Sequence, residues 1–227
     1  MSRHPTAGKG LDLAKIVSAA LDELDAVGLD EISLRGVARR LGVQAPALYW
    51  HVSSKRALLE QIATELWRRP VAAATIGECD ALPVWSDLLR AYMLELRASL
   101  TSRRDGARAA SSAVILDSQL LRDIEPTLAR FATAGVSADD IVTLFQTAQH
   151  ATVGFCINEQ HRAAEPVDLD ERARRLKDSP FVGAMGDAVL GNADARFAAT
   201  IELLIAAGHS TVGRLPNNVL PVDRGDA

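Results

Sequence analysis

The sequence has few of the residues that build disulfide frameworks, metal centres or membrane spans. Its two cysteines, Cys79 and Cys156, lie far apart without CxxC spacing, so they indicate neither a disulfide scaffold nor a tetrahedral zinc site. We expect both to be buried or half-buried thiols in a reducing compartment. No apolar run approaches the roughly 18 residues needed to span a bilayer, and residues 1–10 hold no apolar signal segment. The sequence therefore predicts a cytoplasmic protein without a membrane role.

The common catalytic motifs are also missing. The five histidines do not occur at HExxH spacing, and there is neither a Gly-x-Ser-x-Gly elbow nor a glycine-rich phosphate loop. We therefore expect no enzyme activity, no metal and no cofactor, although a helical-bundle enzyme stays open as an alternative. With 227 residues, the chain is long enough to bury a core without such supports.

Charge is distributed unevenly along the chain. Residues 1–69 hold ten Lys and Arg against eight Asp and Glu, which is a formal charge of +2. Residues 70–227 hold 15 against 21, which is −6, and the two parts give the total of −4. A mildly basic head on an acidic body fits a protein in which only the head meets nucleic-acid phosphates.

Apolar residues recur at helical spacing through most of the chain, and no strand-type alternation occurs, which predicts an all-α fold. Helices are expected over about 13–27, 34–41, 45–50 and 54–69, and then over 85–101, 119–134, 138–159 and 194–212. The local signals are stops at Gly28 and Gly42, N-caps at Ser33 and at Ser53 or Ser54, Pro46 in a first turn, and a stop before Pro70.

The same pattern divides the chain into two predicted domains. Residues 1–69, ordered from about residue 11, form a three-helix helix-turn-helix domain, and residues 70–215 form a larger helical domain for effector binding and dimerisation. Residues 71–83 are expected to be an irregular junction, 160–180 a long loop, and 216–227 a disordered tail.

The second turn of the head has the chemistry of a helix-turn-helix. The two helices must approach closely, so a small residue is needed at their contact, and the turn requires a residue that tolerates positive φ. Ala38 and Gly42, four residues apart, meet these requirements. A bundle with a purely structural role is the alternative, but the short Pro-containing helix and the flanking basic residues favour DNA binding.

Several side chains of the head can contact double-stranded DNA. Arg35 is the best candidate for a bidentate guanine contact and Gln44 the next, while Pro46 and Ala47 allow close approach to the groove floor. Tyr49, His51 and Lys55 can contact phosphates. For Trp50 two interpretations stay open, a contact with DNA and packing against the fourth helix. Solvated or phosphate-steering roles are expected for Arg39, Arg40 and Arg56.

The stretch GLDEISLRGVARRLGVQAPALYWHVSSKRALL resembles the DNA-binding domain of the TetR family of bacterial regulators, and is most similar to that family's tetracycline-repressor branch. The resemblance covers 11–69 closely and continues more weakly into the body. It implies an all-helical homodimer that binds a palindromic operator and is released by a small organic effector. The last two long helices, near 138–159 and 194–212, would build the dimer interface. A DNA-binding regulator without ligand control, or an activator, stays open.

The resemblance also implies individual contacts. The family's DNA-contacting positions fall here on Arg35, Pro46, Tyr49, Trp50, His51 and Lys55. Because Leu34, Ala45 and Ala47 replace polar residues of the tetracycline-binding branch, we expect a different operator sequence.

The effector site departs further from that branch. Its drug and magnesium are held by a histidine, a threonine and a glutamate of the partner subunit, and these positions fall on Ala110, Ala113 and Asn158. Two alanines supply no oxygen ligand to a hard cation, so magnesium-tetracycline is not expected to be the inducer. The neighbouring residue, Glu159, does carry a carboxylate, so a metal-dependent effector stays open as an alternative.

A largely apolar pocket is expected in the body instead, with core packing as the alternative for each residue. Gln149 and His150 are its expected polar handles. The candidate lining residues are Tyr92, Met93, Leu96, Leu116, Leu120, Phe131, Phe145, Gln149, His150 and Phe155.

Overall fold

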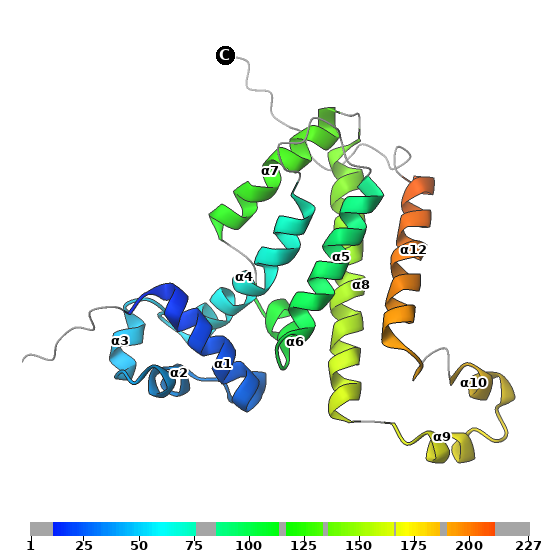
Figure 1. Ribbon diagram of the computed structural model, residues 1–227, viewed down its shortest axis with the longest axis horizontal. Coiled ribbons are helices and arrows are strands. Elements are labelled where there is room, and N and C mark those ends of the chain that lie inside the picture. Colours follow the sequence, from blue (N-terminus) through cyan, green and yellow to red (C-terminus); the bar gives the residue numbers. More distant parts are fainter. Residues whose placement is uncertain are drawn as a thin grey trace, which may run out of the picture.

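The computed structural model describes residues 11–75, 85–113, 117–133, 136–165, 167–186 and 190–211. These residues form helices joined by short connections, and none of them belongs to a strand, so the predicted all-α class is confirmed. A small head of α1, α2 and α3 lies at one end, and α4 leads from it into a body of longer helices (Figure 1). Part of the expected junction lies outside the described residues, and so does all of the expected tail.

The helices of the head begin where the sequence predicts, and α2 also ends at its predicted residue. Its four helices are α1 (Leu13–Glu31), α2 (Leu34–Leu41), α3 (Ala45–Tyr49) and the start of α4 (Lys55–Ala74). Ser33 Oγ accepts from the Gly36 N–H at 3.1 Å and Ser54 Oγ from the Ala57 N–H at 3.1 Å, so both are N-caps. Gly42 closes α2 at φ 66°, a left-handed conformation that favours glycine.

Gly28 interrupts α1 as predicted. Its φ of 81° is not helical, and a last helical turn continues after this kink to Glu31. The turn brings the Leu29 N–H to Asp105 Oδ2 of the body, at 3.0 Å. The kink therefore connects the head to the body as well as ending the helix.

The prediction that the fourth helix ends before Pro70 is wrong. Helix α4 passes through Pro70 and continues to Ala74, across the predicted domain boundary and into the expected junction. A proline inside a helix leaves the carbonyl four residues earlier without its backbone donor. Here that carbonyl belongs to Leu66, and it accepts a hydrogen bond of 2.6 Å from the buried Ser99 Oγ of the neighbouring helix. The donor from another helix makes the proline tolerable.

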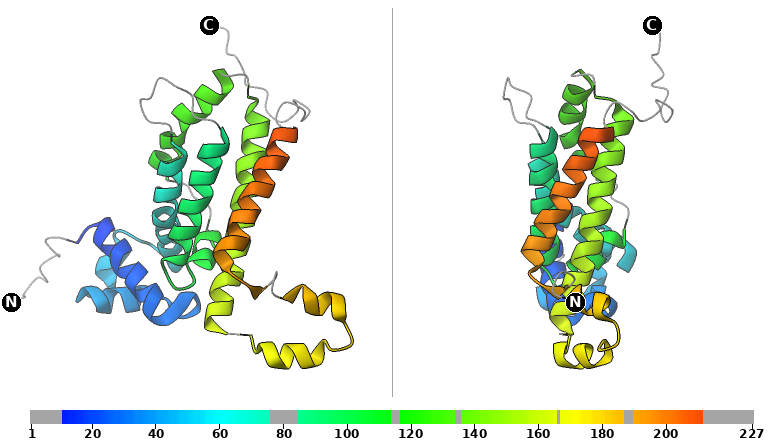
Figure 2. Two further views of the ribbon diagram at one scale, coloured as in Figure 1. Left: turned by 45° about the vertical axis from the view of Figure 1, so that its right-hand side comes forward. Right: turned by 90° about the vertical axis from the view of Figure 1, so that its right-hand side faces the viewer.

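The described part of the body consists of long helices and the short helices α6, α9 and α10. The long ones lie close to their predicted positions, although α8 runs five residues past the predicted end at residue 159. Their bounds are α5 (Trp85–Thr101), α6 (Gly106–Ser111), α7 (Ser118–Thr133), α8 (Ala138–Ala164), α9 (Leu169–Arg175), α10 (Pro180–Ala184) and α12 (Ala193–Thr211). The expected loop over 160–180 is thus partly wrong, because it holds the end of α8 and all of α9. The α9–α10 segment projects from the end of the body (Figure 2).

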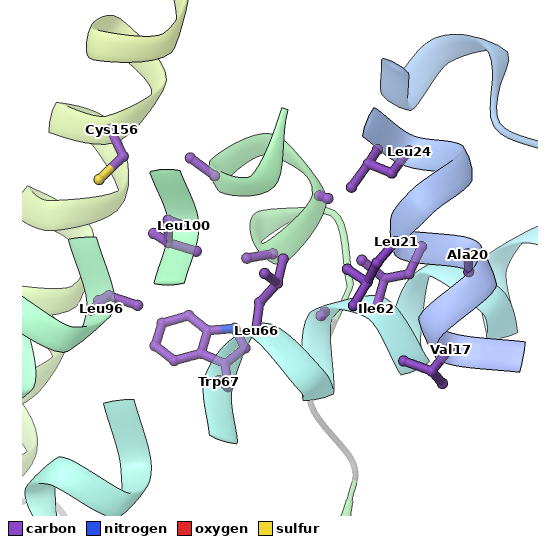
Figure 3. Close-up of a cluster of buried hydrophobic side chains, with 14 of the residues drawn as sticks. Val17, Ala20, Leu21, Leu24, Ile62, Leu66, Trp67, Leu96, Leu100 and Cys156 are labelled. Atoms are coloured by element: carbon purple, nitrogen blue, oxygen red, sulfur yellow. The ribbon is translucent and has the colours of Figure 1, made fainter. Parts of the chain in front are cut away.

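One apolar core joins the head to the body. Buried side chains continue from Leu21 and Leu24 of α1, past Leu66 of α4, to Leu100 of α5 and Cys156 of α8 (Figure 3). Cys156 is fully buried, as expected, and burial raises the pKa of its thiol to about 12, so it stays protonated. Cys79 lies outside the described residues. Within the described residues, no helix is long and apolar enough to cross a membrane.

Candidate DNA-binding surface and effector cavity

The segment around α3 projects polar and aromatic side chains from a rigid base. Leu48 and Val52 are buried and anchor the segment to the head, whereas the side chains between and before them are exposed. Tyr49 and Trp50 are 52% and 90% exposed. The other predicted DNA contacts on this face are exposed or half-buried: Arg35, Gln44, Pro46, Ala47, His51 and Lys55.

The alternative that Trp50 packs against the fourth helix is wrong. Its indole is nearly as exposed as it can be, and Val52 fills the position inside the head instead. A tryptophan so exposed has no role in the core of the monomer. The exposed indole is therefore free for contact with another molecule.

The basic residues of the head divide into two groups. Lys55 is exposed, and its Nζ donates at 3.1 Å to the carbonyl of Asp30, near the end of α1. Arg35 is exposed and forms no ion pair with the residues that the structure describes. Arg40, by contrast, donates through Nε and Nη2 to Glu23 Oε2 at 3.1 and 3.0 Å. Its expected role as a solvated charge is therefore wrong.

Glu23 is a structural residue that the sequence reasoning missed. Its side chain is 5% exposed, although it carries a charge, and it packs against Gly36 of α2. A Cβ on Gly36 would lie 2.1 Å from Glu23 Oε1, so only glycine leaves room for the carboxylate. The pair, together with the expected small residue Ala38, sets how closely α1 and α2 approach. An acidic residue on an otherwise apolar helix face was the available signal.

The body contains a cavity of about 370 Å³ between α4, α5, α7 and α8, within the usual range for small-molecule sites. Its wall is mostly apolar and includes no charged side chain among the described residues. The lining residues are Trp67, Val71, Ala74, Tyr92, Leu120, Leu121, Ile124, Thr127, Leu128, Phe131, Ile141, Val142, Phe145, Gln146 and Gln149.

The structure brings half of the predicted effector residues to this wall. They are Tyr92, Leu120, Phe131, Phe145 and Gln149. The sequence reasoning missed Trp67 and Ala74, and Ala74 lies beyond Pro70, where α4 was expected to have ended. It also missed Ile124 and Leu128, although their helical spacing from Leu120 on α7 was an available signal.

Four predicted residues lie elsewhere, and their expected place in the pocket is wrong. His150 is exposed, because neighbours on a helix point about 100° apart and Gln149 takes the inward position. Met93 and Leu96 are fully buried in solid core. Phe155 packs on Phe197 of α12, with ring centroids 5.0 Å apart. The remaining candidate, Leu116, lies outside the described residues.

The positions that correspond to a magnesium site do not fit that ion. Ala110 is buried in the core and Ala113 has no side-chain oxygen. Asn158 is exposed and donates to the carbonyl of Gly154 at 3.0 Å. Glu159 accepts from Arg97 at 3.0 and 2.5 Å, and it does not line the cavity. Within one protomer, none of these residues lines the cavity or presents an oxygen to a cation there.

Charged groups tie the head to the body beside the Gly28 kink. Asp25 accepts from Arg103 Nη1 at 2.7 Å and from the Arg104 N–H at 2.8 Å. On the other side of this loop, Gln160 of α8 donates to the carbonyls of Leu100 and Arg103 at 3.1 and 2.7 Å. The connection after α5 is therefore hydrogen-bonded to α1 through Asp25 and to α8 through Gln160.

Two family profiles match the chain. The profile described as "Bacterial regulatory proteins, tetR family" matches residues 16–62, and "Tetracyclin repressor-like, C-terminal domain" matches residues 81–209. The tetracycline repressor protein class A from transposon 1721 of Escherichia coli is 34% identical over 170 residues, which cover 73% of this chain and 74% of that protein. The similarity thus includes both the head and the body.

Solved structures agree with this result. A possible TetR family transcriptional regulator from Streptomyces coelicolor A3(2) is 28% identical, with a TM-score of 0.73, over 88% of this chain and 100% of that one. TetR (class A) in complex with 5a,6-anhydrotetracycline and magnesium is 25% identical, with a TM-score of 0.64, over 88% and 99%. This chain therefore belongs to the TetR family of bacterial transcriptional regulators.

Proposed function

We propose that this protein is a ligand-responsive repressor that binds a palindromic operator as a homodimer and leaves it when a small organic effector fills the cavity. The observation that carries the proposal is the course of α4. Its first residue, Lys55, follows the exposed α3 segment after a short connection, and Trp67, Val71 and Ala74 farther along the helix line the cavity. A ligand that displaces the end of this helix would also displace the DNA-binding face.

The alternative is a DNA-binding regulator without ligand control, or an activator. A cavity of this size favours ligand control, because close-packed protein interiors rarely leave such a space unfilled. The predictions below on DNA binding are the same for a repressor and for an activator.

Replacing Lys55 or Tyr49 by alanine is expected to weaken operator binding. Each change should cost about tenfold in affinity, because hydrogen bonds to a charged phosphate contribute roughly 1.5–3 kcal/mol. Lys55→Ala should also reduce the slope of log K against log salt by about one. The measurement is a gel shift, at several salt concentrations, with the DNA upstream of the protein's own gene.

Arg122→Ala is the matched control for Lys55→Ala. Arg122 is an exposed cation on α7, in the body and away from α3, so the same loss of charge should leave the affinity and the salt slope unchanged. Absence of salt-sensitive binding by the unmodified protein would contradict the proposed function. Equal affinities of the Lys55 and Tyr49 variants and the unmodified protein would contradict the docking geometry.

The protein is expected to be a dimer at micromolar concentration. Two heads must lie about 34 Å apart to reach successive major grooves of a palindrome. Helices α8 and α12 pack on each other, and α12 leaves Leu203 69% exposed, a large apolar side chain suited to a partner helix. Light scattering measures the mass directly, and a monomer at this concentration would contradict the proposed assembly.

A further inference from the structure

We propose, on the basis of the proposed function, that the effector is an uncharged aromatic molecule that binds without a metal ion. The first argument is the concentration of aromatic side chains. The sequence contains only ten Phe, Trp and Tyr residues, and four of them, Trp67, Tyr92, Phe131 and Phe145, line the cavity. Tyr92 and Phe145 lie with ring centroids 5.3 Å apart and planes tilted by 56°, so they present both a face and an edge. This arrangement suits the rings of an aromatic guest.

The second argument is the absence of charge from the cavity wall. No Asp, Glu, Lys, Arg or His occurs among its described lining residues. Burial raises the pKa of the Tyr92 phenol well above its usual range, so this group also stays neutral. A charged group on the ligand would lose its hydration without gaining a counter-ion. The wall therefore selects against anions and cations alike.

The third argument is the position of the polar groups. Gln146 and Gln149 lie three residues apart on α8 and border the same cavity, and the buried Thr127 of α7 also lines it. An amide both donates and accepts hydrogen bonds, so it recognises a carbonyl or hydroxyl group without requiring charge. These few groups would orient the ligand while the aromatic and aliphatic wall supplies contact area.

The disagreement with a magnesium site completes the argument. The corresponding positions hold two alanines and an exposed asparagine, and the neighbouring Glu159 already pairs with Arg97. A ligand that reaches this cavity as a metal chelate would find no carboxylate among the described lining residues to complete the coordination and balance the charge of the ion. An uncharged ligand needs none.

The test uses two probes with the same ring system. N-phenyl-1-naphthylamine is uncharged, and 8-anilinonaphthalene-1-sulfonate adds one sulfonate. Fluorescence titration of the full-length protein should show the uncharged probe binding once per protomer. Two competitors are then compared for their ability to displace this probe. The sulfonate should be needed at a concentration at least tenfold higher than a non-fluorescent, uncharged analogue of N-phenyl-1-naphthylamine. Equal or better displacement by the sulfonate would overturn the proposal.

Two variants locate the binding and the charge preference. Ala74 is fully buried and lines the cavity, so Ala74→Phe should fill the space and weaken the uncharged probe at least tenfold. Gln149→Lys should instead improve the sulfonate at least fivefold, because it places a cation at the wall; this variant tests the cavity even if Ala74→Phe does not fold. Unchanged binding of both probes in both variants would overturn the proposal.

A titration with chlortetracycline tests the metal. Because chlortetracycline is ionised at neutral pH, it should bind weakly, and added MgCl₂ should not strengthen the binding. A gain of tenfold or more in apparent affinity with MgCl₂ would overturn the metal-free assignment. The operator gel shift is independent of these probes. If the protein binds the uncharged probe selectively but shifts no operator DNA, the proposed repressor function is rejected and the ligand class is retained. If it shifts operator DNA but does not prefer the uncharged probe, only the ligand class is rejected.

Discussion

Gly36→Ala is expected to lower the free energy of unfolding by about 1–3 kcal/mol, the usual range for overpacking a core. The added Cβ would lie 2.1 Å from Glu23 Oε1. That carboxylate cannot swing aside freely, because it is buried and accepts two hydrogen bonds from Arg40. Since α2 carries Arg35 and precedes α3, operator affinity should fall together with stability. Urea unfolding and the operator gel shift measure the two effects.

The double variant shows whether the carboxylate is the cause. In a Glu23→Ala background the obstacle is gone, so adding Gly36→Ala should cost less than half of what it costs in the unmodified protein. Gly183→Ala on α10 is the matched control, because no heavy atom lies within 4 Å of its added Cβ. Additive effects in the double variant would contradict the proposed clash.

Asp25→Ala should also destabilise the protein, by about 1–2 kcal/mol. It removes two charge-assisted hydrogen bonds to the connection after α5, and the estimate is reduced from the usual value because the Asp25 side chain is 37% exposed. The melting temperature should fall by about 2–4 °C per kcal/mol. Hydrogen exchange at the Leu29 amide, which donates to Asp105, should accelerate as this contact between head and body loosens.

Asp22→Ala is the matched control for this contact. Asp22 is more exposed and lies at 3.5 Å from the same arginine, so its loss should change stability by less than about 0.5 kcal/mol. In 1 M NaCl the difference in stability between the two variants should shrink, because the Debye length falls to roughly 3 Å and the ion pairs are screened. Equal effects of the two substitutions in low salt would contradict the assigned role of Asp25.

Local signals in the sequence were sufficient for the head. Ser33, Ser54, Gly28 and Gly42 act within three or four residues of themselves, as N-caps or as glycines at positive φ. Such signals need no distant partner, so they can be recognised before the fold is known.

Interactions between distant residues could not be predicted in this way. Pro70 indicated a helix end, yet Ser99 supplies the missing donor to Leu66 from another helix, 33 residues away. Glu23 lies on an apolar helix face, but its partners Arg40 and Gly36 belong to α2. Local propensity is overridden wherever a tertiary contact satisfies the group it leaves unpaired.

The sequence alone thus determined the all-α class and the helix-turn-helix head, because these depend on periodicity and on local backbone chemistry. Only the tertiary structure decided which body residues surround the cavity. Gln149 faces it and His150 does not, and Val71 and Ala74 reach it because α4 continues past Pro70. A cavity forms where several helices fail to fill the space between them, and that property belongs to their relative positions rather than to any one segment.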